Sequence, residues 1–308
     1  MIRILIFALF LAISTPAAAN SPIRFIVPFT PGGTSDLMAR ILAEAITQET
    51  NERVVVENRP GGFIAVGVQH LLNQPLDGRS IIIAATGTLT HHHYSPGARN
   101  LTTQLSIISA IAETPMVMLV ANNLPIRNLR EFVEYTRINQ QNMNYATLGQ
   151  GGIMQMSADL LFRNTNINIT PIAYQGSLPA VTDLAAGRIQ MMFDPVPIGM
   201  QTHRNGNARA IAVTGRERSR FAPDIPTFLE LGYDVEFTPW HAIWVAAGTP
   251  DSARQQTNQI IQRALQNPTA IRRYMDAGVE RVLGTSIEES EALLRTAQNK
   301  WIRILEIK

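Results

Sequence analysis

Two patterns of hydrophobic and polar residues alternate along most of the chain. Short runs rich in Val, Ile and Phe end at Gly, Pro or Asn, and between these runs apolar residues recur every three to four positions. The first pattern predicts β-strands and the second predicts amphipathic α-helices, so we expect βαβ units around mostly parallel sheets. The expected strands are Ile23–Val27, Arg53–Val56, Ser80–Ala85, Met116–Val120, Met143–Ala146, Thr170–Tyr174, Ile189–Phe193, Ala208–Val213 and His241–Ala246.

Helical periodicity is clear after the first strand and returns through the chain. Residues 154–162, 180–186 and 260–265 each carry apolar residues at helical spacing. The stretch 252–308 is expected to be helical, with breaks at Pro268 and Gly284. The first expected helix presents one apolar face made of Leu37, Met38, Ile41, Leu42, Ala45 and Ile46. An α/β body closed by a helical tail is therefore predicted.

The chain has no internal repeat and no low-complexity linker. If it forms two domains, the chain must cross between them inside secondary structure. The strand-like segments Met116–Val120 and His241–Ala246 are the expected crossing points.

The amino terminus has the organisation of a secretory signal. Arg3 precedes the apolar run Ile4–Ile13, and the small residues Ala17, Ala18 and Ala19 follow. We expect residues 1–19 to be removed as a secretory signal and the mature chain to be soluble. No later segment approaches the roughly 18 apolar residues of a membrane-spanning helix, and the absence of cysteine excludes a lipoprotein anchor and disulfides.

Charge adds little to this picture. Lys and Arg number 26 and Asp and Glu 24, and no basic block or basic-aromatic interleaving suggests nucleic acid. Charged residues are only 16% of the chain and hydrophobic residues 45%, which indicates a large buried core.

A glycine pair marks the first junction between strand and helix, in "VPFTPGGTSDLMAR". Gly32 and Gly33 allow a tight turn, and Thr34, Ser35 or Asp36 can cap the helix that follows. The exposed N–H groups at a helix start attract carboxylate or phosphate. A P-loop lysine and the G-x-G-x-x-G fingerprint are both absent. Two interpretations remain open here, a site for a small anion and ordinary turn-and-cap chemistry.

The same device recurs in "VVVENRPGG" and "NYATLGQGG". Parallel strands place their carboxyl ends at one edge of a sheet, where open α/β folds bind ligands. Three such turns could therefore face one crevice.

An ordered set of segments resembles one protein family. The set is "VPFTPGGTSDLMAR", "VVVENRPGG", "NYATLGQGG", "YQGSLPAVTDLAAGRIQMMFD", "ARAIAVTGRERSRFAPDIPTFLELG" and "VAAGTP". Over essentially the whole mature chain it is similar to the Bug-type periplasmic solute receptors, the substrate-binding components of tripartite tricarboxylate transporters.

The resemblance implies a type II periplasmic-binding-protein fold, with two α/β domains joined by crossing strands around a ligand cleft. It implies a first domain of residues 20–118 and 240–308 and a second of residues 119–239. It also implies a non-enzymatic receptor without cofactor that binds a small carboxylate and delivers it to permease subunits in the membrane. The expected site residues are Thr30, Gly32, Gly33, Thr34, Ser35, Asp36, Gly61, Gly62, Phe63, Gly149, Gly151, Gly152, Gln175, Gly176, Ser177 and Asp194.

The chain departs from the family pattern at two turns. Phe63 follows Gly62 where relatives carry a further small residue and a second glycine, and Gly152 and Gln155 stand where relatives commonly carry threonine and histidine. The loss of a hydroxyl donor favours a different and less polar ligand, since an unpaired buried acceptor costs about 1–3 kcal/mol.

Other functions are also compatible with parts of the sequence. His91, His92 and His93 invite a metal hypothesis, but adjacent strand residues point to opposite faces, so a polar surface or cleft-rim loop is the alternative. Asp36 and Asp194 could form an acid/base pair or serve as cap and turn residues. Two other functions remain as alternatives. One is a solute receptor whose closed form is recognised by a membrane sensor kinase. The other is a secreted hydrolase on a similar fold, although no G-x-S-x-G or H-E-x-x-H motif is present. The three tryptophans are expected in the core.

Overall fold

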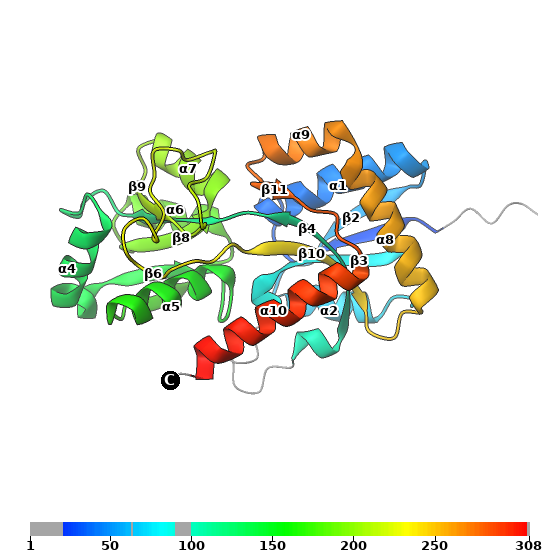
Figure 1. Ribbon diagram of the computed structural model, residues 1–308, viewed down its shortest axis with the longest axis horizontal. Coiled ribbons are helices and arrows are strands. Elements are labelled where there is room, and N and C mark those ends of the chain that lie inside the picture. Colours follow the sequence, from blue (N-terminus) through cyan, green and yellow to red (C-terminus); the bar gives the residue numbers. More distant parts are fainter. Residues whose placement is uncertain (1–20, 63, 90–99, 307–308) are drawn as a thin grey trace, which may run out of the picture.

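The computed structural model describes residues 21–62, 64–89 and 100–306. These residues form two lobes placed side by side along the long axis, each a β-sheet flanked by helices (Figure 1). The first lobe contains the amino-terminal strands and the second contains the middle of the chain. The expected α/β fold is confirmed, whereas Phe63, the histidines 91–93 and the expected signal segment lie outside the described residues.

The sheet of the first lobe has the strand order β2-β1-β3-β10-β4-β11. Strands β1, β2 and β3 are parallel, and β10 lies antiparallel between β3 and β4. The carboxyl ends of β1, β2 and β3 therefore meet at one edge of the sheet. The strands are β1 (Ile23–Val27), β2 (Val54–Asn58), β3 (Ser80–Ala85), β4 (Leu105–Glu113), β10 (Trp240–Ala246) and β11 (Arg281–Val282).

The sheet of the second lobe repeats this arrangement, with the order β7-β6-β8-β5-β9. Strands β6, β7 and β8 are parallel, and β5 lies antiparallel between β8 and β9. In each lobe, the strand that enters from the other lobe is thus inserted beside the third strand. The strands are β5 (Met116–Val120), β6 (Asn144–Thr147), β7 (Thr170–Ala173), β8 (Met191–Pro195) and β9 (Arg209–Val213).

The chain crosses between the sheets in two connections that lie side by side. The first is the two-residue step from Glu113 to Met116, and the second enters β10 at Trp240. The N–H of Thr114 donates to the carbonyl of Pro239 at 3.1 Å and joins the two connections. The boundary expected after residue 118 falls too late, because the whole of β5 pairs within the second sheet.

Helices cover both faces of each sheet. Figure 1 shows α1 and α9 on the upper side of the first lobe and α6 and α7 on the upper side of the second, with α2, α10 and α5 below. The helices are α1 (Thr34–Thr50), α2 (Ala65–Leu72), α4 (Leu129–Asn139), α5 (Ile153–Thr165), α6 (Ser177–Ala185), α7 (Val196–Arg204), α8 (Asp251–Gln266), α9 (Pro268–Asp276) and α10 (Ile287–Glu306), with 3-10 turns η1 (Thr86–Leu89), η2 (Leu101–Thr103) and η3 (Gln140–Asn142). Each apolar stripe lies against its sheet, as α1 does with Met38, Ile41, Leu42 and Ala45.

Strand β4 was not expected from sequence, and its irregular register explains why. Its pairing with β10 shifts between His241 and Ala242 and again between Ile243 and Trp244. Two bulges interrupt the alternation of the apolar residues and leave backbone groups without ladder partners. Side chains bond these groups: Asn258 donates to the carbonyl of Ile108 at 2.8 Å, and Thr285 accepts from the N–H of Ala110 at 2.9 Å. Strand β11 has two residues, too few to show a pattern.

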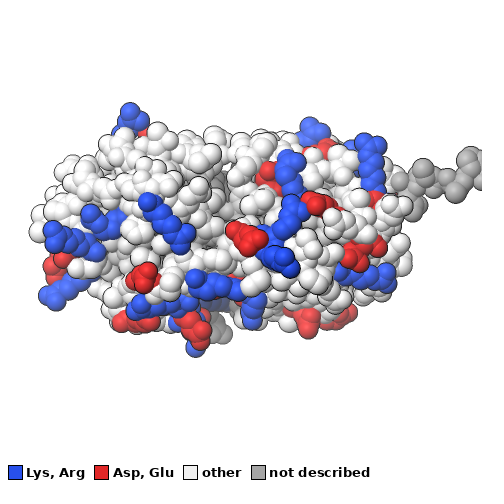
Figure 2. All heavy atoms as spheres, turned by 90° about the horizontal axis from the view of Figure 1, so that it is seen from above, with Lys and Arg blue, Asp and Glu red and all other residues white. Residues whose placement is uncertain are grey.

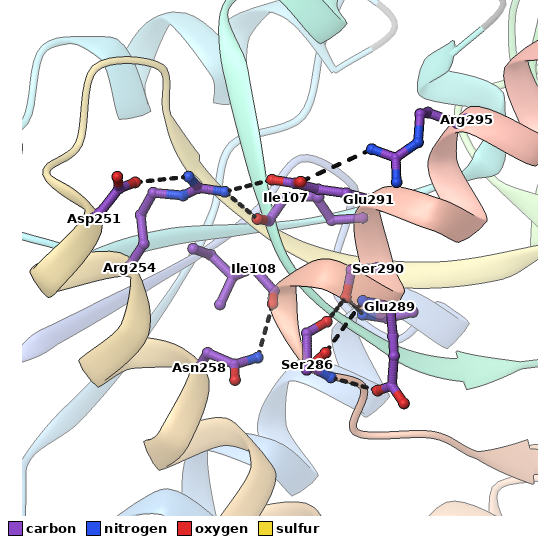
Figure 3. Close-up of polar contacts among 11 residues, drawn as sticks. Ile107, Ile108, Asp251, Arg254, Asn258, Ser286, Glu289, Ser290, Glu291 and Arg295 are labelled. Atoms are coloured by element: carbon purple, nitrogen blue, oxygen red, sulfur yellow. Dashed lines mark hydrogen bonds and ion pairs between the residues drawn. The ribbon is translucent and has the colours of Figure 1, made fainter.

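Arg254 of α8 fastens the start of α10 to the first lobe. Its guanidinium donates to Asp251 and to Glu291 of α10, both at 3.0 Å, and to the carbonyl of Ile107 at 3.4 Å (Figure 3). A capping box begins α10, in which Glu289 N–H donates to Ser286 and Ser286 N–H donates to Glu289. These contacts fix the helix where it crosses β4.

The far end of α10 belongs to the other lobe. Trp301 is 1% exposed and lies within the core cluster of the second lobe, where its ring meets Phe237 edge-on at 4.9 Å. Leu293, Leu294 and Ala297 of the same helix pack against the first lobe. Helix α10 therefore spans both lobes. Among the helices that the structure describes, none is long and apolar enough to span a bilayer.

Candidate functional site

The buried carboxylate of Asp36 holds the first glycine turn through hydrogen bonds. Its carboxylate accepts from the Gly32 N–H at 3.0 Å, from Asn58 at 2.8 Å, and from Arg40 at 3.0 and 3.1 Å. Burial would raise the pKa of Asp36, but the hydrogen bonds from Arg40, Gly32 and Asn58 outweigh it and hold the pKa below its usual value. The carboxylate expected to meet the ligand is thus engaged by its own loop.

This arrangement leaves the start of α1 open to an anion. Gly33 precedes the helix without a side-chain cap, and within the described residues the N–H groups of Gly33, Thr34 and Ser35 donate no hydrogen bond. A Cβ placed on Gly32 or Gly33 would meet no atom within 4 Å, so the turn borders open space. Unused donors and the positive end of the helix dipole together favour a carboxylate or phosphate here.

The second glycine turn lies beside the first. Asn58, the last residue of β2, bonds Asp36, and the Arg59 N–H donates to the Val27 carbonyl at 2.8 Å. Gly61 and Gly62 have φ of 130° and 55°, which explains the need for glycine. The turn therefore borders the same edge of the sheet, as expected.

The third glycine turn uses the device of the first. The Gly151 N–H donates to the side chain of Gln155 at 2.9 Å, four residues on, as Gly32 does to Asp36. Gly149 is in the left-handed region at φ 120°. Gln155 therefore holds its own loop.

Two contacts bring the turns of the two lobes together. A Cβ placed on Gly176, which starts α6, would lie 3.5 Å from Thr30 Oγ1 in the first lobe. A Cβ on Gly87 would lie 2.9 Å from the Gly151 carbonyl oxygen and 3.2 Å from the Gly152 Cα. Strand exits from both lobes therefore converge at one junction between the lobes.

Asp194 lies on the second-lobe side of this junction. It is fully buried at the end of β8, and Ser177 donates to its Oδ1 at 2.7 Å. Its Oδ2 has no hydrogen-bond partner in the described part of the chain. Burial raises the pKa of Asp194 to about 7, and the hydrogen bond from Ser177 offsets only part of this rise. Gln175 is exposed.

Several residues of the junction were missed from sequence. Arg40 and Asn58 hold Asp36, and Gly87 lies against Gly151 and Gly152 of the other lobe. A glycine directly after the strand "SIIIAA" was the available signal for Gly87. Asp36 and Asp194 have separate partners in separate lobes. In the described ranges no group of three His, Cys, Asp or Glu could hold a metal ion. The three tryptophans are buried, as expected.

Surface charge does not point to a large polyanionic partner. Figure 2 shows basic and acidic side chains interspersed on the upper face, and the formal net charge is +2. At the first turn, the cation of Arg40 is paired with Asp36. Backbone N–H groups are therefore the main attraction for an anion at this end of the junction.

Comparisons agree with this geometry. The solved structure of the periplasmic binding protein BugD is 29% identical, with a TM-score of 0.83, covering 92% of this chain and 96% of that one. MatC from Rhodopseudomonas palustris with bound malate, at 23% identity and a TM-score of 0.83, shares the fold over 92% and 98% of the two chains. The fold and junction are those of a two-lobed periplasmic binding protein.

Sequence relatives define the family. The model of the tripartite tricarboxylate transporter family receptor matches residues 38–308. BugT of Bordetella pertussis is 27% identical over 308 aligned residues, covering 95% of this chain and 92% of that one. The chain belongs to the tripartite tricarboxylate transporter receptor family, whose members are solute-binding receptors.

Proposed function

We propose that this protein captures a small carboxylate solute between its lobes in the periplasm and presents it to the membrane permease of a tripartite tricarboxylate transporter. The observation that carries the proposal is the open start of α1, where the N–H groups of Gly33, Thr34 and Ser35 border the contact of Thr30 with Gly176. Family membership supports the carboxylate and the permease.

Capture requires that the ligand touch both lobes. A ligand shifts the equilibrium between open and closed forms only through its difference in affinity for the two. The Thr30–Gly176 and Gly87–Gly151 contacts bring the walls together around one place. Each hydrogen bond to an ionised carboxylate contributes about 1.5–3 kcal/mol, so a few backbone donors with closure give micromolar affinity or better.

The first test is a thermal-shift screen of carboxylic acids with isothermal titration of the hits. A solute that binds only the folded chain raises stability by RT ln(1 + [L]/Kd). We expect at least one carboxylate to bind with micromolar affinity and its neutral amide to bind far less. Equal binding of acid and amide would contradict the proposal.

A backbone substitution tests the α1 donors directly. Thr34 is the first residue of the helix, where proline is tolerated, and Gly33 has the extended conformation (φ −83°, ψ 172°) that proline demands of its predecessor. Thr34→Pro removes one N–H and is expected to weaken carboxylate binding at least tenfold without loss of stability. Thr34→Ala is the matched control, because it removes the hydroxyl and keeps the N–H. Unchanged affinity in Thr34→Pro would remove this N–H from the site.

Two experiments address location and delivery. Expression of the full chain in a Gram-negative host should yield a periplasmic protein whose first residue is Asn20. Deletion of the cognate permease should abolish uptake of the bound carboxylate while leaving its binding unchanged. An unprocessed chain, or uptake without the permease, would contradict these parts of the proposal.

A further inference from the structure

The lobes contact one another on both sides of the crossing connections. In the first sheet, β1 and β3 lie on one side of the crossing strands β10 and β4, and β11 lies on the other side. In the second sheet, β6 and β7 lie on one side of the crossing strand β5, and β9 lies on the other side. The turns at which Thr30 meets Gly176 follow β1 and β7. The strands β9 and β11 are therefore behind the crossing connections, away from these turns.

The end of β9 and the start of β11 both lie beside the first crossing connection. Val213 at the end of β9 pairs with Val117, and Arg281 at the start of β11 pairs with Glu113. Val117 and Glu113 lie on either side of the short step between the two sheets. The segments that follow β9 and precede β11 are thus brought to the same place from different lobes.

Glu280 makes the contact between these two segments. Its N–H donates to the carbonyl of Glu113 at 3.0 Å, which fixes its backbone at the end of β4. Its carboxylate accepts from Ser219 Oγ at 2.5 Å and from the Arg220 N–H at 3.2 Å, and the Arg220 side chain lies 3.4 Å away. Ser219 is 2% exposed, so water competes little for its hydrogen bond. We call the contact of Glu280 with Ser219 and Arg220 the rear contact.

Close packing accompanies the rear contact. Gly278 precedes Glu280 by two residues, and a Cβ placed on it would overlap the ring of Pro197 at the start of α7. The two lobes therefore cannot approach one another further at this point. A rotation about the crossing connections that separates Thr30 from Gly176 would bring the lobes closer together behind those connections. Such an opening motion must therefore displace Glu280 from its partners in the second lobe.

Residues 214–220, which carry the second-lobe half of the rear contact, are fastened to both crossing connections. The first of them donates from its N–H to the carbonyl of Met116 and accepts from the N–H of Phe237, both at 2.9 Å. Arg216 pairs with Glu236 at 3.2 Å. This loop therefore moves with the second-lobe ends of the crossing connections, whereas Glu280 moves with the first lobe. The rear contact responds to the position of one lobe relative to the other.

We propose that the rear contact is a latch that stabilises the closed arrangement of the lobes, with Glu280 as a positioning residue. The hydrogen bonds of Glu280 are present in the arrangement in which Thr30 meets Gly176, so they favour it over any arrangement that separates Glu280 from Ser219. A solute that needs both lobes binds more tightly when the closed form is more populated. This consequence for capture rests on the proposed function, whereas the latch itself requires no solute.

Distances between spin labels test the latch in the full mature chain without any solute. The chain has no cysteine, so Gln69→Cys on α2 and Ala185→Cys on α6, both at exposed positions, introduce one label site in each lobe. These helices follow β2 and β7, the sheet edges on the side of the glycine turns, so their separation grows as the lobes open. In double electron–electron resonance, we expect Glu280→Ala to raise the ratio of open to closed protein at least fivefold.

Matched variants assign the effect to the rear contact. Ser219→Ala should shift the distances in the same direction, and the double variant with Glu280→Ala should shift them no further than Glu280→Ala alone, because both remove one interaction. Glu217→Ala is the control, since Glu217 is an exposed glutamate of the same loop, and it should give the wild-type distances. Circular dichroism confirms that each labelled protein is folded.

Three results would overturn the latch. They are wild-type distances in folded Glu280→Ala, a shift toward shorter distances, and additive shifts from Ser219→Ala and Glu280→Ala. Because no solute is present, any of these results leaves the proposed carboxylate receptor standing. Conversely, a chain that binds no carboxylate contradicts the proposed function while the distances still report on the latch.

Discussion

Thr30 and Gly176 face one another across the two lobes, although they belong to different sheets. A Cβ on Gly176 would lie 3.5 Å from Thr30 Oγ1, an ordinary van der Waals distance. Gly176 has φ 165° and ψ 170°, an extended conformation open to any residue. Its contact can therefore be varied without backbone strain, which makes the approach of the lobes accessible to substitution.

Closure is tested by the pair Gly87→Ala and Gly176→Ala. The methyl group of Gly87→Ala would lie 2.9 Å from the carbonyl oxygen of Gly151, too close for a real contact, so one of these two turns must move away from the other. We expect affinity to fall at least tenfold and the radius of gyration of the ligand-bound protein, measured by X-ray scattering, to rise. Gly176→Ala is the control and should bind as the wild type does. Equal behaviour of the two variants would show that the two contacts do not govern closure.

Asp36→Ala tests whether the carboxylate positions the first turn. Asp36 accepts from Gly32, Asn58 and Arg40, so its loss should lower the free energy of unfolding by about 1–3 kcal/mol. Arg40 is half exposed, so its ion pair with Asp36 contributes little to this loss. Ligand affinity should fall as well, because Gly32 loses its anchor. Chemical denaturation and titration measure the two effects.

Two further variants show whether the Asp36 carboxylate positions the first turn or contacts the ligand directly. Asp36→Asn retains an acceptor oxygen for Gly32 and should recover much of the stability and affinity. Asp251→Ala removes an aspartate that is 89% exposed and paired with Arg254, and it should change stability by less than about 0.5 kcal/mol. An Asp36→Ala protein of wild-type stability with reduced affinity would instead place the carboxylate on the ligand.

Much of the lobe architecture was predictable because it depends on local pattern. Strands β1, β3 and β5 have the expected bounds, since each is a short run of mostly apolar residues. The glycine turns were recognisable because left-handed backbone, as at Gly149, requires that residue. Local pattern and turn chemistry agree in these segments.

The rest depends on contacts between distant residues. Asn58 lies 22 positions from Asp36. Neither segment indicates by itself that the Asp36 carboxylate will accept its hydrogen bonds from the protein and not from a ligand. Thr114 and Pro239 belong to no motif and come together only because two crossing connections run side by side. Bulges in β4 interrupt the alternation of apolar and polar residues from which this strand could have been predicted. Tertiary contacts override local signals at these places.

Asp194 and His241 should give opposite dependences of stability on pH. The folded pKa of Asp194 is about 7 against an ordinary 3.8, so between pH 4 and 7 the folded state keeps a proton that the unfolded state releases, and stability falls as pH rises. The folded pKa of His241 is about 4 against 6.5, so between pH 4 and 6.5 the unfolded state holds the extra proton, and stability rises with pH. Each slope is about 1.4 kcal/mol per pH unit, and in the wild type the two oppose each other.

Single variants should separate the two slopes. Asp194→Asn leaves the His241 contribution, so its free energy of unfolding, relative to wild type, should increase with pH between 4 and 6.5. His241→Phe leaves the Asp194 contribution, and its relative stability should decrease with pH over the same range. Urea unfolding at pH 4.5, 5.5 and 6.5 without ligand measures both. Profiles parallel to the wild type would mean that neither group is buried as described.

Trp301 should couple the stabilities of the two lobes. The start of α10 is fixed to the first lobe by Arg254 and Glu291, while Trp301 fills the core of the second lobe against Phe237. Trp301→Ala removes a large buried ring, which typically costs about 3–5 kcal/mol. It also releases the second lobe from the helix, so calorimetry should show one transition for the wild type and two for Trp301→Ala. Ile302→Ala is the control, because Ile302 is 36% exposed and should shift stability by less than about 0.5 kcal/mol. A single transition in Trp301→Ala, displaced no further than in Ile302→Ala, would mean that α10 does not link the lobes.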